Sequence, residues 1–141
     1  MTRHRSTLLR RIICLVVGGF FLIAGITKAT DPGLFLEDIR SFQILPDPWA
    51  AWLALGLPWL EITAAMAVIS GIWRPGGLLT ITAMLVIFIS GALHAMSRGL
   101  DIRCGCFGGD ATTHYAELLT RNAVLLALTL CALAGRPAGK K

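Results

Sequence analysis

Charged side chains are scarce in this sequence: only 15% of its 141 residues are Asp, Glu, Lys or Arg. A soluble globular domain carries about 25%. Hydrophobic residues make up 55% of the chain, and the mean hydropathy is +0.71. So little charge excludes an ordinary soluble domain, and the excess of apolar side chains indicates a membrane protein. The length suits one integral membrane domain over residues 1–141.

The alternation of polar and apolar residues that marks transmembrane β-strands is also missing. The sequence contains four continuous apolar runs instead, and a bilayer is crossed by about 20 residues of helix. The cleavage-like site Thr27-Lys28-Ala29 carries a lysine at its centre, so the first run is expected to stay as a helix. We therefore predict an all-α fold, a polytopic membrane four-helix bundle, with helices over about 12–28, 49–73, 78–97 and 117–134.

Acidic residues are absent from the two ends of the chain and from the second loop. These parts hold eight basic residues, namely Arg3, Arg5, Arg10, Arg11, Arg74, Arg136, Lys140 and Lys141. Short cytoplasmic loops are enriched in Lys and Arg. We therefore predict a multi-pass protein of the inner (cytoplasmic) membrane, with both termini in the cytoplasm and the first and third loops outside. The net charge of +5 then reflects topology, so membrane lipid is expected as a partner and nucleic acid is not.

A few polar residues interrupt the apolar runs in the outer half of the predicted bundle: Lys28, Glu61, His94, Arg121 and Asn122. Ionisable groups within spans usually face the bundle interior or water. We therefore predict a shared polar pocket, in which Glu61 pairs with Lys28 or Arg121. Three simpler readings stay open: the two cations extend to the membrane surface, His94 bonds a backbone carbonyl, and Glu61 is a neutral acid.

The third loop carries the motif Cys104-Gly105-Cys106. On the outer side of a membrane, disulfides form and persist. A ring closed by two cysteines one residue apart is small and strained, and strained, exposed disulfides exchange readily. An inert structural disulfide is the alternative. Thiolates also bind zinc or copper, but two ligands are too few unless His94 or His114 joins them, so no metal site is predicted.

The sequence holds two further cysteines, Cys14 and Cys131, inside the first and fourth apolar runs. A buried cysteine usually packs as a small apolar side chain, and we expect that here. A second cysteine pair on the outer side is therefore missing.

The first outer loop begins with a turn or helix-start signal at Asp31-Pro32-Gly33. The apolar residues that follow it, Leu34, Phe35, Leu36 and Ile39, predict an amphipathic segment on the membrane surface.

Several short motifs resemble the MauE/DoxX family of redox-associated membrane proteins. They are Gly25-Ile26-Thr27-Lys28, Asp31-Pro32, Phe35, Leu57-Pro58-Trp59-Leu60-Glu61, Cys104-Gly105-Cys106-Phe107-Gly108 and Arg121-Asn122. The resemblance implies a four-helix membrane protein that supplies or matures disulfides, as proposed for methylamine dehydrogenase maturation in methylamine metabolism. It implies either a thiol–disulfide oxidoreductase or its membrane partner, with Cys104 and Cys106 as the reactive residues. The partner is expected to be a thioredoxin-like or other extracytoplasmic thiol protein. A quinone is one electron carrier that could serve as a cofactor.

Two other classes of function stay open from the sequence. One is a bundle that binds or transports a small molecule, a quinone or another compound, with Glu61 and Arg121 as its coupling pair. The other is a structural subunit for the assembly of a larger membrane complex.

Overall fold

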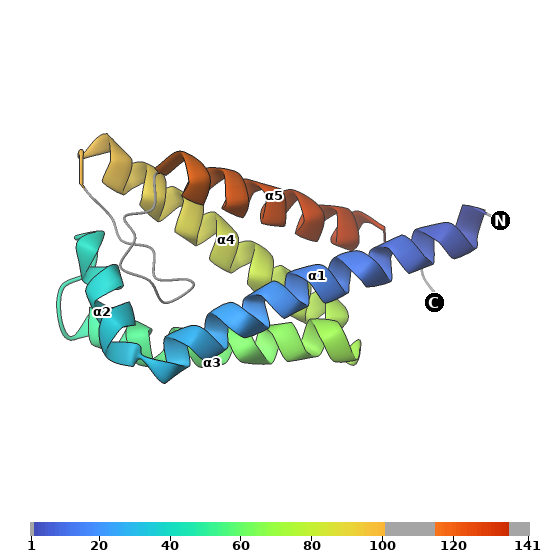
Figure 1. Cartoon of the computed structure of the whole chain (residues 1–141), viewed down its shortest axis with the longest axis horizontal. Coiled ribbons are helices and arrows are strands. Elements are labelled where there is room, and N and C mark those ends of the chain that lie inside the picture. Colours follow the sequence, from blue (N-terminus) through green and yellow to red (C-terminus); the bar gives the residue numbers. More distant parts are fainter. Residues whose placement is uncertain (1, 101–114, 136–141) are drawn as a thin grey trace.

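The computed structural model describes the backbone of residues 2–100 and 115–135, and the side chains from residue 7 onward within those ranges. This part of the chain forms α-helices and no strand (Figure 1). The helices are α1 (Thr2–Thr30), α2 (Pro32–Ser41), α3 (Trp49–Ser70), α4 (Arg74–Ser97) and α5 (Tyr115–Ala134).

Four of these helices are long and apolar enough to cross a membrane: Thr7–Thr30, Trp49–Ser70, Arg74–Ser97 and Tyr115–Ala134. The prediction of an all-α bundle with four spans is confirmed, and the chain is a multi-pass membrane protein. Successive spans run in opposite directions (Figure 1). The end of α1, the start of α3, the end of α4 and the start of α5 therefore lie at the same end of the bundle.

The helices extend beyond the apolar runs at some ends and stop short at others. Helix α1 starts at Thr2 rather than near residue 12. The arginines and leucines before residue 12 have high helix propensity, so the helix begins before the apolar run. Helix α3 ends at Ser70 rather than 73, because Gly71 adopts a left-handed conformation with φ of 80° and caps it. Helix α4 already begins at Arg74, where a proline stands in its first turn.

Helix α2 folds back over one end of the bundle (Figure 1). The carboxylate of Asp31 caps it by accepting a hydrogen bond of 3.0 Å from the backbone N–H of Leu34, and Pro32 occupies the first turn. The expectation of an apolar face toward the membrane surface is wrong for Phe35. That ring is 4% exposed and faces the protein, so α2 covers the bundle end.

Helices α1 and α3 pack against each other more extensively than any other pair of described helices. A Cβ atom added at Gly25 would lie 2.8 Å from Cγ1 of Ile62 and 3.0 Å from the backbone oxygen of Pro58. A Cβ atom added at Gly18 would lie 2.6 Å from Cγ1 of Ile69. In lipid, helices associate through such close contacts of small residues because no hydrophobic effect drives them together.

The buried core is shared by α1, α3, α4 and α5. Its residues are Cys14, Val17, Phe21, Ala64, Ala65, Val68, Leu78, Ile81, Met84, Leu85, Leu125 and Ala132. At the end opposite α2, Nε of Arg10 donates a 3.0 Å hydrogen bond to the backbone oxygen of Ala132, which links α1 to α5.

The glycine contacts yield a stability prediction. We expect Gly25→Ala to lower the free energy of unfolding by about 1–3 kcal/mol, because the methyl group meets a backbone oxygen that cannot move aside. Gly19→Ala is the matched control on the same helix, since a Cβ atom there meets nothing within 4 Å. The measurement is unfolding of the full chain in bicelles. Equal stability of the two variants would contradict the close α1–α3 contact.

Candidate functional site

The cysteine motif, Cys104 and Cys106, lies outside the described residues. The described residues on either side of it are close together, because the hydroxyl of Tyr115 donates a hydrogen bond to the backbone oxygen of Leu100. These residues lie where α4 ends and α5 begins. The loop that carries the motif is therefore attached at the end of the bundle that α2 covers.

Beneath this end, Lys28 of α1 and Glu61 of α3 form a buried ion pair. Nζ of Lys28 lies 2.6 Å from Oε1 of Glu61, and the two side chains are 3% and 4% exposed. The sequence left two cations open as the partner of Glu61, and the structure places Lys28 there. The ammonium group also lies 5.0 Å from the ring centre of Phe35 and 5.5 Å from that of Phe88. Aromatic faces attract cations, so Lys28 is held inside the bundle and does not extend to the surface.

The backbone packing explains how the two charges meet. Lys28 is in the last turn of α1, one turn after Gly25. A Cβ atom at Gly25 would lie 3.2 Å from Cβ of Glu61, so the two helices are in close contact at this level. Because the backbones are this close, the ammonium and the carboxylate can meet in the core.

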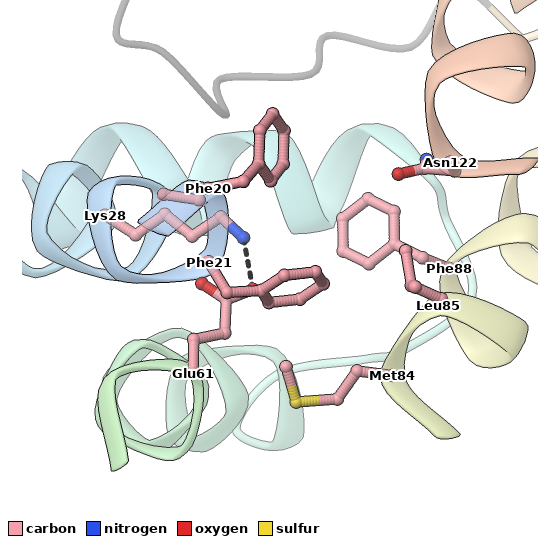
Figure 2. A pocket seen from close by; sticks show the side chains of 9 residues that line it. Phe20, Phe21, Lys28, Glu61, Met84, Leu85, Phe88 and Asn122 are labelled. Carbon is pink, nitrogen blue, oxygen red and sulfur yellow. Dashed lines mark hydrogen bonds and ion pairs between the residues drawn. The ribbon is translucent and has the colours of Figure 1, made fainter. Parts of the chain in front are cut away.

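A cavity of about 30 Å³ lies beside the ion pair. Its walls come from α1, α3, α4 and α5: Phe20, Phe21, Ala24, Lys28, Glu61, Met84, Leu85, Phe88 and Asn122 (Figure 2). Three residues of the predicted polar pocket, Lys28, Glu61 and Asn122, thus share one cavity. The apolar walls were not predicted as site residues. On α1, however, the spacing of Phe21, Ala24 and Lys28 marks one helix face and could have indicated them.

The other two predicted pocket residues lie elsewhere. Arg121 is half-buried, and its guanidinium carbon lies 5.9 Å from the ring centre of Phe20. It borders the cavity's wall but does not line the cavity. His94 is exposed, and its backbone oxygen accepts a 2.7 Å hydrogen bond from the hydroxyl of Ser97. The structure therefore does not bring His94 to the ion pair.

The two remaining cysteines differ from each other. Cys14 is 1% exposed and packs in the core, as expected. Cys131 is exposed on the outside of α5, so the expectation that it is buried is wrong. Its place in the last turns of α5 puts it at the end of the bundle opposite α2.

The size of the cavity limits what it can hold. Sites for small molecules usually enclose about 300–1,000 Å³, so this cavity is far smaller than such a site. Within residues 2–100 and 115–135, no three His, Cys, Asp or Glu side chains are grouped so as to hold a metal ion. In its present shape the cavity accepts a ligand of the size of water.

A model of the family described as "Methylamine utilisation protein MauE" matches residues 6–135. Three curated proteins, each called methylamine utilization protein MauE, are similar. That of Paracoccus denitrificans is 31% identical over 120 residues, which cover 84% of this chain and 64% of that protein. That of Methylorubrum extorquens is 30% identical over 120 residues, 81% and 64% of the two chains. That of Paracoccus versutus is 29% identical over 126 residues, 88% and 68% of the two chains.

The chain therefore spans slightly less than two thirds of the length of the first two relatives. No solved structure matches it significantly.

The buried ion pair yields a double-mutant prediction. We expect Lys28→Met alone and Glu61→Gln alone each to lower the free energy of unfolding by about 3–5 kcal/mol, because each leaves a buried polar partner unmatched. The double variant should recover most of that loss, since it buries no charge. Unfolding in bicelles measures all three.

The exposed pair Arg40–Asp47 is the matched control for this cycle. Its atoms are also close, at 2.7 Å, but its side chains are 50% and 54% exposed. Asp47→Asn should therefore cost about 0–1 kcal/mol. Losses in the double variant Lys28→Met/Glu61→Gln that equal the sum of the single losses would show that the buried charges do not depend on each other.

Proposed function

The chain belongs to the MauE family, and from that membership we propose that it is a membrane protein of thiol–disulfide chemistry that supports disulfide formation in extracytoplasmic proteins. The observation that carries the proposal is the motif Cys104-Gly105-Cys106. Its loop joins α4 to α5 at the end of the bundle covered by α2. The hydrogen bond between Tyr115 and Leu100 supports the proposal because it gives this loop a fixed base.

The proposed exchange starts from an oxidised Cys104–Cys106 pair. A thiolate of the client protein attacks one of the two sulfur atoms, the S–S bond breaks, and a mixed disulfide forms. The second client thiol then displaces the chain's sulfur. The client loses two electrons and two protons and gains a disulfide, while Cys104 and Cys106 become thiols.

For turnover, an oxidant outside the chain has to take two electrons from these thiols. A membrane quinone or the disulfide of a thioredoxin-like protein has the required chemistry. The chain's other cysteines do not support an internal relay, because Cys14 is buried in the core and Cys131 is near the opposite end of the bundle. We therefore propose that the chain works with a partner protein rather than as a complete enzyme.

The pathway and location follow from the family and the charge pattern. The names of the relatives support a role in methylamine utilisation. Methylamine dehydrogenase as the client is what the family resemblance implies. The basic residues at both ends and at Arg74 support an inner-membrane location with cytoplasmic termini. Four crossings agree with two termini on one side. In that orientation the cysteine motif faces the oxidising compartment.

The first test of the proposal is removal of the motif. We expect Cys104→Ser/Cys106→Ser to lose thiol exchange with the client completely while membrane insertion is unchanged. Cys14→Ala/Cys131→Ala is the matched control and should keep full exchange. Thiol alkylation before and after reduction, followed by mass spectrometry, gives the redox state of each form, and client disulfides are counted in the same cells.

Two results would contradict the redox function. One is full client oxidation in cells carrying Cys104→Ser/Cys106→Ser. The other is loss of function in Glu61→Gln with no effect of the cysteine variant, which would favour a small-molecule binding or transport bundle at the cavity.

The second test concerns orientation. In a variant whose only cysteine is Cys104, a membrane-impermeant maleimide should label intact spheroplasts. In a variant lacking all four native cysteines, Ile72→Cys should be labelled only after permeabilisation, since Ile72 is 85% exposed in the turn between α3 and α4 at the other end of the bundle. The reverse labelling pattern would place the motif in the cytoplasm, where disulfides do not persist.

A further inference from the structure

We propose that a second copy of this chain packs against the outer side of α3, with Trp59 of each copy seated on Gly56 of the other. The surface concerned, which we call the Trp59 face, consists of Trp52, Gly56, Trp59 and Thr63. These residues follow one another at intervals of four, three and four along the sequence, so they lie on one side of the helix, and all four are exposed. The pairing goes beyond the proposed redox function and does not depend on it.

Trp59 lies at an unusual depth for an exposed tryptophan. It is close to the middle of the 22 residues of α3, about 15 Å along the helix axis from the first of them. Tryptophans that anchor a protein in a membrane lie at the two membrane surfaces instead, as Trp49 and Trp73 do at the ends of their spans. The Trp59 side chain is 63% exposed, and lipid chains offer no acceptor to its indole N–H. Surface anchoring therefore does not account for Trp59.

Gly56, one turn before Trp59, provides the complementary space. A Cβ atom added at Gly56 would meet nothing within 4 Å, so the Trp59 ring of the same copy does not cover this point. A glycine also leaves the backbone oxygens of its turn accessible, and each oxygen has a second lone pair that can accept a hydrogen bond. This turn of α3 thus offers room for an aromatic ring and an acceptor for its N–H.

The depths of the ring and of the open space point to a second copy as the occupant. All copies are inserted in the same orientation, so two α3 helices can meet in parallel about a two-fold axis along the membrane normal. Each residue is then at the same depth as its counterpart. Helical side chains lean toward the N-terminal end of their helix, so the Trp59 ring of one copy reaches the depth of Gly56 in the other. The symmetry repeats this contact, and the two contacts form together.

The composition of the Trp59 face agrees with a contact between helices. Small residues let helices approach closely in lipid, and tryptophan supplies a large contact area. Glu61 is the only charged residue of α3 and is buried in the bundle, so no like charges face each other across the axis. The exposed side of α1 differs, because Leu15, Ile23 and Ile26 are branched aliphatic residues that suit lipid chains.

Disulfide crosslinking in the cell membrane tests the contact. In a variant of the full chain that lacks all four native cysteines, Thr63→Cys places a thiol on the Trp59 face, close to the proposed axis. We expect oxidation with copper phenanthroline to join most of these chains into pairs of twice the chain's mass. Ile23→Cys in the same background is the matched control and should stay mostly monomeric. Ile23 is 55% exposed and lies at a similar depth on α1, two residues before the contact of Gly25 with Ile62.

Substitutions on the Trp59 face test the ring and the open space separately. Energy transfer between donor-labelled and acceptor-labelled chains, diluted stepwise in lipid vesicles, measures the self-association constant. We expect Gly56→Leu and Trp59→Leu each to weaken self-association by about tenfold or more, because each removes the fit of the ring into the space. Trp73→Leu is the matched control and should leave the constant unchanged, since Trp73 is 76% exposed but lies at the start of α4. Gly56→Ala, a smaller change, serves if the leucine variant does not fold.

The proposal is overturned if energy transfer in the wild-type chain is no greater than random mixing gives at the same dilution. Equal crosslinking of Thr63→Cys and Ile23→Cys would also overturn it, because the chains would then meet without a preferred face. A crosslinked product that contains a different protein would assign the Trp59 face to another partner and reject the second copy. None of these results depends on the cysteine motif, so the proposed redox function is tested separately.

Discussion

The buried ion pair between Lys28 and Glu61 constrains how the helices of this protein can be arranged. Both charges are inside the bundle, and neither has bulk water to solvate it. If α1 slid or rotated against α3, one charge would face lipid or the apolar core without its partner, which is strongly unfavourable. The pair therefore fixes one register for the two helices. The glycine contact at Gly25 makes this register possible, since a side chain there would hold the backbones too far apart.

The remaining elements are arranged around this fixed pair. Phe35 of α2 and Phe88 of α4 face the Lys28 ammonium group, so the helix that covers the bundle end and the third span both contact the same charge. Asn122 brings α5 to the cavity. Each helix thus contributes a side chain to one small region in the half of the bundle that α2 covers.

The sequence predicted how far along its span each polar residue lies, but not which way its side chain faces. Hydropathy and length identified four spans, because lipid requires long apolar helices. Lys28, Glu61 and Asn122 were placed in one pocket from their positions along the spans. His94 is at a comparable depth, but at this level of α4 it is the neighbouring Ala92 and Ala95 that are buried, so the imidazole faces out.

The same distinction explains the other differences. Arg121 and Asn122 are adjacent, and successive residues in a helix point about 100° apart, so only one of them reaches the cavity. For the same reason, Cys131 is exposed where the sequence predicts burial, and Phe35 is buried where it predicts contact with the membrane surface. The facing direction of a side chain depends on which helices pack together, and in a uniformly apolar span no hydrophobic stripe marks the inner face. Here the glycines at the α1–α3 contact determine it, because only faces without bulky side chains can approach so closely.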